Sequence, residues 1–187
     1  IVPAMTFVAT PMSVSYTGAK PVFVDTLYPS GLIDFNKIEE KITSRTKAII
    51  PVHLYGYPCR MDEILKISKE FKIKIIEDAA QGVGVHYKNK HVGTFGDIGV
   101  LSYYGNKTIT TAEGGMILTQ NEKIYKSCYR LKNHGRDNKG TFIHENIGYN
   151  FAFTDLQAAI GVAQMKKLNK IIKRKKEIFD MYFYELN

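Results

Sequence analysis

The sequence lacks the features that mark membrane proteins and disulfide-rich secreted proteins. No apolar run in its 187 residues approaches the roughly 18–20 residues that a membrane-spanning helix needs. No signal peptide opens the chain, and its two cysteines, Cys59 and Cys128, make no disulfide framework. We therefore interpret both as free structural thiols and expect a reducing, cytoplasmic setting.

Ligand spacing for a metal ion is also missing. Four of the histidines stand at positions that match no metal-binding pattern, either with each other or with the cysteines: His86, His91, His134 and His144. We therefore expect no metal site. The fifth, His53, follows an apolar strand-like run, and it suits a hydrogen-bonded structural histidine as well as a substrate contact.

The net charge of +8 could indicate a nucleic-acid partner. Much of the excess lies in the basic segment 166–176, where apolar residues recur at helical spacing between the cations. No nucleic-acid motif accompanies it. We interpret the segment as the solvated face of an amphipathic helix whose lysine stems cover apolar surface. A basic surface of this kind could also attract an anionic, phosphate-bearing substrate.

Strand-like and helical runs alternate along the chain. Helices are expected over 6–19, 34–42, 61–71, 122–131 and from 154 onward, and strands over 21–25, 47–52, 74–78, 98–103 and 115–119. The near-continuous apolar strands favour an α/β fold, with a mostly parallel sheet and helices on both faces. The last two strands are expected to form a hairpin-like excursion at one edge.

Two polar side chains are expected where strands of this sheet end, which is where open α/β sheets bind ligands. Asp78 ends the 74–78 strand, and a carboxylate held there needs a cationic partner, such as the protonated pyridine nitrogen of pyridoxal 5'-phosphate (PLP). A helix N-cap is the simpler interpretation of the same residue. Ser102 lies near the end of the 98–103 strand, where its hydroxyl could bind a phosphate.

Lys107 lies in a polar glycine- and threonine-rich turn just past that strand. Its amine would become a Schiff-base nucleophile if a nearby cation or desolvation lowered its pKa, and the free amine could later move a proton between two substrate carbons. A lone lysine in a loop is usually a surface residue, so the hypothesis depends on the combination of residues. Glu113 lies close by and is interpreted as support for its own turn rather than as a substrate contact.

Seven segments occur in one order along the chain: TFVAT (6–10), AKPVFVD (19–25), PVHLYG (51–56), EDAAQ (77–81), GTFGD (93–97), GNKTITT (105–111) and GYN (148–150). Together they resemble the sugar aminotransferases of the DegT/DnrJ/EryC1/StrS family, which are PLP enzymes of fold type I. The resemblance covers essentially the whole chain. Segment 105–111 is most similar to enzymes that aminate C4 of a 4-keto-6-deoxy sugar nucleotide.

The resemblance implies roles for four residues near the cofactor. Lys107 matches the lysine that binds PLP covalently, and Asp78 matches the acid that pairs with the pyridine nitrogen. Gln81 matches a residue near the phenolic oxygen of the cofactor. Ser102 matches a ligand of its phosphate.

Two further positions extend the implied site. Asn150 matches an asparagine that reaches the phosphate of the neighbouring subunit's cofactor, which implies a homodimer with shared active sites. Phe7 occupies a position where an aromatic side chain stacks on the cofactor ring. Plain core packing is nearly as good an explanation of Phe7.

The resemblance also sets expectations for the domain organisation. Residues 1–153 would form the core of the PLP-binding large domain, and 154–187 a long helix that leads towards a small C-terminal domain. The chain starts at Ile1 and stops inside a helical pattern, so we expect a fragment that lacks the family's N-terminal phosphate-binding segment and that C-terminal domain. Ala112 and Ala152 depart from the family pattern, which often has glycine at the first position and arginine at the second.

The expected function is a PLP-dependent aminotransferase. It would convert a nucleotide-linked 4-keto-6-deoxy sugar to the 4-amino sugar, with glutamate as amino donor, for surface polysaccharide or glycan biosynthesis. One alternative is the sister dehydratase chemistry of the family, against which Lys107 argues because histidine replaces the lysine there. The other alternative is a truncated or non-catalytic aminotransferase-like protein.

Overall fold

The computed structural model describes residues 1–137, 140, 142–144 and 146–186. Its central sheet has the strand order β3-β4-β7-β8, formed by β3 (Ala48–Ile49), β4 (Lys74–Asp78), β7 (Ile98–Ser102) and β8 (Gly115–Leu118). The first three strands run parallel, and β8 pairs antiparallel with β7. The predicted parallel sheet and the hairpin-like excursion at its edge are therefore both confirmed.

The two strands nearest the N-terminus extend this sheet beyond β3. They are β1 (Val2–Pro3) and β2 (Phe23–Val24), which pair in parallel. The amino group of Ile1 donates to the carbonyl of Ala48 at 2.8 Å, and the amide of Ile50 donates to the carbonyl of Ile1 at 2.9 Å. These bonds place β1 beside β3, so the parallel pairing continues across the core.

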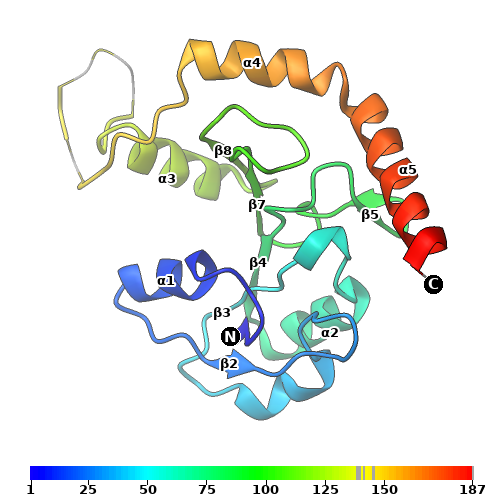
Figure 1. The fold of residues 1–187 in the computed structure, drawn as a ribbon. Coiled ribbons are helices and arrows are strands. Elements are labelled where there is room, and N and C mark those ends of the chain that lie inside the picture. Colours follow the sequence, from blue (N-terminus) through cyan, green and yellow to red (C-terminus); the bar gives the residue numbers. More distant parts are fainter. Residues whose placement is uncertain (138–139, 141, 145, 187) are drawn as a thin grey trace.

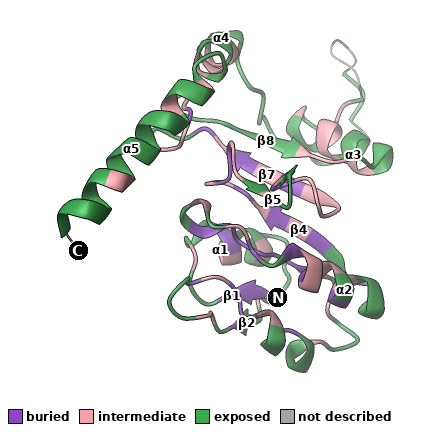
Figure 2. Cartoon of the chain, turned by 90° about the vertical axis from the view of Figure 1, so that its right-hand side faces the viewer, coloured by how far each residue is buried: buried purple, intermediate pink, exposed green. Residues whose placement is uncertain are grey.

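Helices cover both faces of the sheet (Figure 1). On one face lie α1 (Ala9–Tyr16) and α3 (Glu122–Lys132), and on the other lie α2 (Met61–Phe71) and the hairpin of β5 (His86–Tyr87) and β6 (Lys90–His91). The apolar face of α2 is buried, with Met61, Ile64 and Ile67 packed in one cluster with Ile49 and Ile75 of the strands. Figure 2 shows this burial concentrated on the central strands.

The predicted helix over 34–42 is wrong in type. The segment forms two 3-10 helices, η1 (Phe35–Lys37) and η2 (Glu39–Lys41). Asp34 caps the first as expected, because its carboxylate accepts a hydrogen bond from the amide of Asn36 at 3.1 Å. The fully buried Ile38 lies between the two turns. One tight turn lies on each side of Ile38, and together they direct its side chain into the core.

The single long helix expected over 154–187 is also wrong, because two helices form there: α4 (Asp155–Met165) and α5 (Leu168–Leu186). Between them the amide of Lys167 donates to the carbonyl of Gln164 at 2.9 Å, a tight turn that changes the direction of the chain (Figure 1). The turn lets Leu168 and Ile171 pack against a second core cluster, which includes Ala79, Val83, Val92, Leu101, Tyr103 and Ile109.

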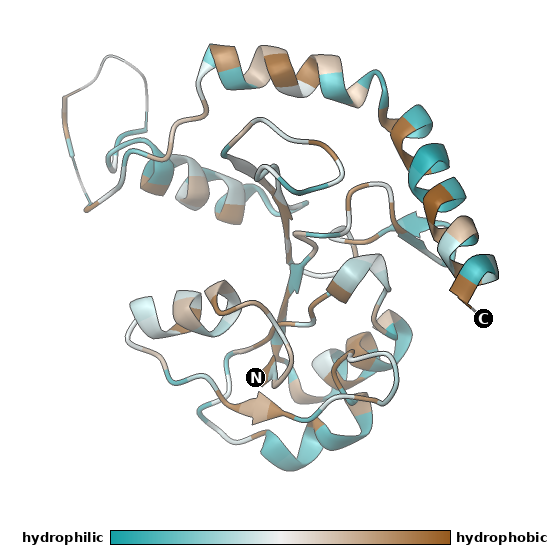
Figure 3. Cartoon of the chain, viewed as in Figure 1, coloured by the Kyte–Doolittle hydropathy of each residue, from teal (hydrophilic) through white to brown (hydrophobic). Residues whose placement is uncertain are grey.

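Apolar residues are concentrated in the strands, and the outward faces of α3 and α5 are mixed in character (Figure 3). This agrees with the interpretation of the basic segment as an amphipathic helix for 168–176, whereas Lys166 and Lys167 lie in the turn between α4 and α5. Within the described residues, no helix combines the length and the hydrophobicity needed to cross a membrane.

Candidate active site

Asp78 is the last residue of β4, at the carboxyl end of the sheet. One carboxylate oxygen accepts a hydrogen bond from the hydroxyl of Thr10 at 2.7 Å, and the other accepts one from the amide of Ala80 at 3.1 Å. No helix begins in the residues that follow, 79–85, so the N-cap interpretation of Asp78 is wrong. The carboxylate is instead a fixed, half-buried anion whose remaining lone pairs are available to a ligand.

The first turn of α1 is tied to this carboxylate through Thr10, which is only 4% exposed. The hydroxyls of Thr6 and Thr10 lie 2.9 Å apart, and the carbonyl of Phe7 accepts a hydrogen bond from the amide of Thr10. Phe7 itself is 76% exposed, so plain core packing of its ring is wrong. Sequence reasoning overlooked Thr10, although it is part of the TFVAT segment on which the resemblance rests.

Ser102 ends β7, next to β4 in the sheet. Its hydroxyl accepts a hydrogen bond from the amide of Tyr104 at 3.3 Å. Asp78 pairs with Val100 in the register of β4 and β7, so Ser102 lies two residues further along the neighbouring strand. The two predicted cofactor ligands are therefore at one edge of the sheet, as the strand pattern indicated.

Lys107 lies in the loop 103–114 between β7 and β8. The carbonyl of Tyr103 closes this loop by accepting hydrogen bonds from the amide of Thr111 at 2.9 Å and the hydroxyl of Thr110 at 3.1 Å. Glu113 acts through its backbone carbonyl, which accepts the hydroxyl of Thr111 at 2.7 Å. This contact supports the turn, as expected. The closed loop presents Lys107, half-buried, to a pocket.

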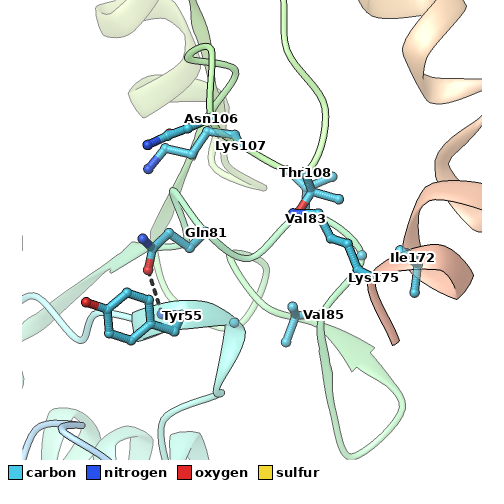
Figure 4. A pocket seen from close by; sticks show the side chains of 11 residues that line it. Tyr55, Gln81, Val83, Val85, Asn106, Lys107, Thr108, Ile172 and Lys175 are labelled. Atoms are coloured by element: carbon cyan, nitrogen blue, oxygen red, sulfur yellow. Dashed lines mark hydrogen bonds between the residues drawn. The ribbon is translucent and has the colours of Figure 1, made fainter. Parts of the chain in front are cut away.

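That pocket has a volume of about 420 Å³ and brings Lys107 together with Gln81 (Figure 4). The side-chain oxygen of Gln81 accepts a hydrogen bond from the amide of Tyr55, and this bond fixes the orientation of the carboxamide. Its NH₂ group is left to donate on the side towards Lys107. Tyr55 has a left-handed backbone (φ 53°), so the Gln81 contact also holds a strained turn in place.

Glu77 precedes Asp78 and is fully buried. Its carboxylate accepts amide hydrogen bonds from Gly93, Phe95 and Gly96 at 2.6–2.7 Å. It also accepts a fourth hydrogen bond from Nε2 of His53 at 3.1 Å. Burial alone would raise the pKa of Glu77, but these hydrogen bonds outweigh burial and hold the pKa below its ordinary value. Glu77 therefore binds the GTFGD loop and the end of the 47–52 strand to β4.

His53 has a structural role in this arrangement. Its ring is fully buried, and its Nδ1 accepts a hydrogen bond from the amide of Cys59 at 3.1 Å. The proton must then be on Nε2, which donates to Glu77. Of the two interpretations of His53, the hydrogen-bonded structural histidine fits. Burial, together with the charges of Glu77 and Asp78, raises the pKa of the Cys59 thiol to about 12.

The GTFGD loop lies against β7 so closely that a side chain at Gly99 could not fit. A Cβ there would lie 1.9 Å from the carbonyl oxygen of Gly93. The GTFGD loop is therefore held in place both by its hydrogen bonds to Glu77 and by its close packing against Gly99. This packing fixes the start of β7, the strand that ends at Ser102.

Asn150 lies apart from this pocket. It forms an isolated antiparallel bridge with Asn133 at the end of α3, and it is not among the residues that line the pocket beside Lys107. The structure thus brings Asp78 and Ser102 to one sheet edge and Gln81 and Lys107 to one pocket, and it places Asn150 elsewhere. The predicted role of Asn150 in a neighbouring subunit stays a prediction. Within the described residues there is no group of histidine, cysteine and carboxylate side chains that could hold a metal ion.

Known proteins resemble the chain over its whole length. The GDP-perosamine synthase of Escherichia coli O157:H7 is 45% identical over 187 residues, which are 100% of this chain and 51% of that protein. Among solved structures, a mutant of GDP-4-keto-6-deoxymannose-3-dehydratase (ColD) with bound GDP-perosamine matches with a TM-score of 0.91 and 31% identity, over 99% of this chain and 52% of that one. A Streptococcus pneumoniae sugar aminotransferase candidate in its PLP-form matches with a TM-score of 0.90 and 31% identity, over 98% and 52%.

These matches span about half the length of the curated relatives. The family model described as the DegT/DnrJ/EryC1/StrS aminotransferase family matches residues 1–187. Three of the segments that carry the resemblance, TFVAT, EDAAQ and GNKTITT, supply residues of the sheet edge and the pocket described above. This chain belongs to the DegT/DnrJ/EryC1/StrS aminotransferase family, a family of PLP-dependent enzymes.

Proposed function

We propose that the protein is a nucleotide-sugar aminotransferase that converts a nucleotide-linked 4-keto-6-deoxy sugar to the 4-amino sugar, with glutamate as amino donor. The observation that carries the proposal is the placement of Lys107 and Gln81 in one pocket beside the strand ends of Asp78 and Ser102. The 45% identity to a GDP-perosamine synthase supports this substrate class. The product would serve surface polysaccharide or glycan biosynthesis.

The residues present fit PLP. The anionic Asp78 at the sheet edge suits a protonated pyridine nitrogen, the exposed ring of Phe7 offers a flat apolar surface, and the hydroxyl of Ser102 suits a phosphate. When bound, PLP supplies an electron sink that stabilises negative charge at a substrate carbon. Asp78, Phe7 and Ser102 together would hold and orient the cofactor.

The chain's own residues would do the remaining work. Lys107 would take a proton at Nζ from the carbon of the amino donor and later deliver one to C4 of the sugar, as general base and acid. Thr10 and Ala80 would hold the Asp78 carboxylate in a fixed orientation by donating to both of its oxygens. Gln81 would donate its NH₂ group to an oxygen of the ligand, because Tyr55 already occupies its carbonyl oxygen.

Dehydratase chemistry is the second candidate, since one structural neighbour is a sugar-nucleotide dehydratase. Lys107 argues against it, because that reaction in this family is associated with histidine in place of the lysine. A non-catalytic role is disfavoured by the complete set of Asp78, Ser102 and Lys107. We also propose a homodimer in which Asn150 reaches the phosphate of the cofactor bound by the neighbouring subunit.

Spectroscopy of the native-length protein with PLP tests this proposal. We expect visible absorbance from PLP joined to the protein, and borohydride should fix the cofactor on the peptide that contains Lys107, as read by mass spectrometry. Lys107→Ala should lose both signals, whereas Lys66→Ala, a change at an exposed lysine of α2, should keep them. A parent protein with no such absorbance, or with the cofactor fixed on another lysine, would rule out the proposed mechanism.

A further inference from the structure

The basic run 173–176 of α5 is not uniform, because its four cations have different surroundings. The guanidinium of Arg174 pairs with Glu177 at 3.2 Å, and the ammonium of Lys176 pairs with Asp180 at 2.7 Å. Both of these pairs are exposed and lie on the helix itself. Lys175 instead lines the pocket that contains Lys107. Interpreting the whole run as a solvated face is therefore incomplete.

The position of Lys175 is set by the way α5 packs. Leu168 and Ile171 pack against the second core cluster, and Ile172 lies so close to Gly84 that a Cβ there would be 2.5 Å from its Cδ1 atom. Lys175 follows one helical turn after Ile171 and Ile172, so it lies on the same side of the helix. In Figure 4 its side chain extends from α5 towards the loop that carries Thr108.

The pocket has the charge and the size for an anionic ligand. Among the described residues that line it are two cations, Lys107 and Lys175, and no carboxylate side chain, and the other lining residues are apolar or neutral. A volume of about 420 Å³ is in the range of small-molecule sites and exceeds what a carboxylate alone would need. Lys107 and Gln81 line the pocket, but Asp78 and Ser102 do not, so its lining reaches α5 and not these two strand ends.

We propose that Lys175 binds the diphosphate of the nucleotide-linked sugar and so determines how the substrate lies across the site. This inference rests on the proposed function and deepens it. The sugar carbon would lie at Lys107 and Gln81, and the diphosphate would extend towards α5, where the ammonium group of Lys175 donates to its oxygens. A lysine suits this task because its compact ammonium on a flexible stem binds phosphate oxygens as a point charge.

Binding of GDP to the native-length protein tests the role of Lys175 without any turnover. Calorimetry should show that Lys175→Ala weakens GDP binding by about tenfold, the order expected for loss of one charge-assisted hydrogen bond. Lys175→Arg should retain most of the affinity. The matched control is Lys176→Ala, because Lys176 is adjacent in sequence and pairs with Asp180. dTDP serves as a second nucleoside diphosphate, so that preference for one base does not decide the result.

Steady-state kinetics adds a second readout. In Lys175→Ala, KM for the sugar nucleotide should rise with little change in kcat, because the lost contact is remote from the reacting carbon. The half-reaction with glutamate should be unaffected. If Lys175→Ala instead slowed only the half-reaction with glutamate, Lys175 would bind the carboxylate of the donor, and the inference would be overturned. It is also overturned if the parent binds neither nucleotide, or if Lys176→Ala weakens binding as much as Lys175→Ala does.

The two proposals fail separately. Nucleotide binding needs no cofactor, so a parent protein that binds GDP through Lys175 but cannot fix PLP on Lys107 would contradict the aminotransferase function alone. Normal PLP attachment with unchanged GDP affinity in Lys175→Ala would contradict the inference alone.

Discussion

At the scale of single residues, Glu77 shows how a site can depend on a side chain that faces away from it. The carboxylate is buried and accepts four hydrogen bonds from two separate parts of the chain, the GTFGD loop and His53. Because its pKa in the folded protein is lowered, ionised Glu77 contributes stability above the ordinary glutamate pKa of 4.5. That contribution is lost as the pH falls through the lowered, folded-state pKa.

Glu77→Gln should therefore destabilise the fold without changing its volume. The amide would place an NH₂ group among amide donors, and we expect a cost of about 2–4 kcal/mol near neutral pH. Urea unfolding measures this difference, with Glu70→Gln on the exposed face of α2 as control. The difference between parent and variant should shrink below the ordinary glutamate pKa. A cost that does not depend on pH would show that the charge of Glu77 is unimportant.

Ala112 departs from the family pattern at a position whose backbone is left-handed (φ 67°). Such a backbone is strained for alanine and free of strain for glycine. Ala112→Gly should stabilise the protein by about 1 kcal/mol in thermal or urea unfolding. Ala158→Gly, inside α4, is the matched control and should have the opposite sign. Destabilisation by Ala112→Gly would mean that the alanine methyl group makes a contact that outweighs the strain.

At the scale of elements, the sequence predicted best where a periodic pattern and a clear end signal coincide. The bounds of α2 and β4 agree with the prediction because each is a strong apolar pattern that ends in polar residues. The hairpin of β5 and β6 was missed. Its turn places Lys88 and Asn89 at positive φ, a conformation usually signalled by Asn-Gly, and this pair is a weak signal.

The candidate site was predictable only in part, for a related reason. Asp78 and Ser102 are the last residues of their strands, so strand prediction alone brings these two to one edge of the sheet. The contact between Thr10 and Asp78 joins residues 68 positions apart, and no local pattern indicates such a contact. The break between α4 and α5 depends on packing against the second core cluster. The helical periodicity of 154–187 gives no sign of this contact either.

The packing of α5 against the rest of the chain can be tested at Gly84. Gly84→Ala adds a methyl group 2.5 Å from Ile172, at a backbone with φ +83°. Gly18→Ala measures the backbone strain of alanine at positive φ alone, because Gly18 has φ +77° and nothing within 4 Å of the added Cβ. We expect about 1 kcal/mol of destabilisation at Gly18 and more at Gly84, where faster hydrogen exchange in α5 should accompany it. Equal effects at both sites would mean that Ile172 moves aside without cost.

At the scale of the whole molecule, several large apolar side chains are exposed between the end of α3 and the first turn of α4. Ile147 is 84% exposed and Leu156 is 81% exposed, and Phe142, Ile143 and Phe151 are also exposed. Exposed apolar surface of this extent marks interaction sites in proteins. Its proximity in sequence to Asn150 supports the homodimer proposed above.

Leu156→Glu in the native-length protein tests this association. The new carboxylate would lie in the first turn of α4, where a negative charge suits the helix, so the monomer fold should be preserved. Burying the charge in an interface would be costly, and sedimentation should show a shift from dimer towards monomer. Lys66→Glu on α2 introduces a carboxylate away from this segment, with a larger change of net charge, and should leave the mass of the assembly unchanged. A dimer unaffected by Leu156→Glu would place the interface elsewhere.

The closeness in sequence of four predicted cofactor residues has a consequence for how the protein folds. Asp78, Gln81, Ser102 and Lys107 lie within one short stretch, in which β4 and β7 pair directly. Closing so short a loop carries a small entropic cost, so this part of the structure can form early on the folding pathway. The bond from Thr10 to Asp78 and the contact of Ile172 with Gly84 join distant parts of the chain and must close larger loops. The strand edge would then form first, and the helices that complete the site would dock onto it afterwards.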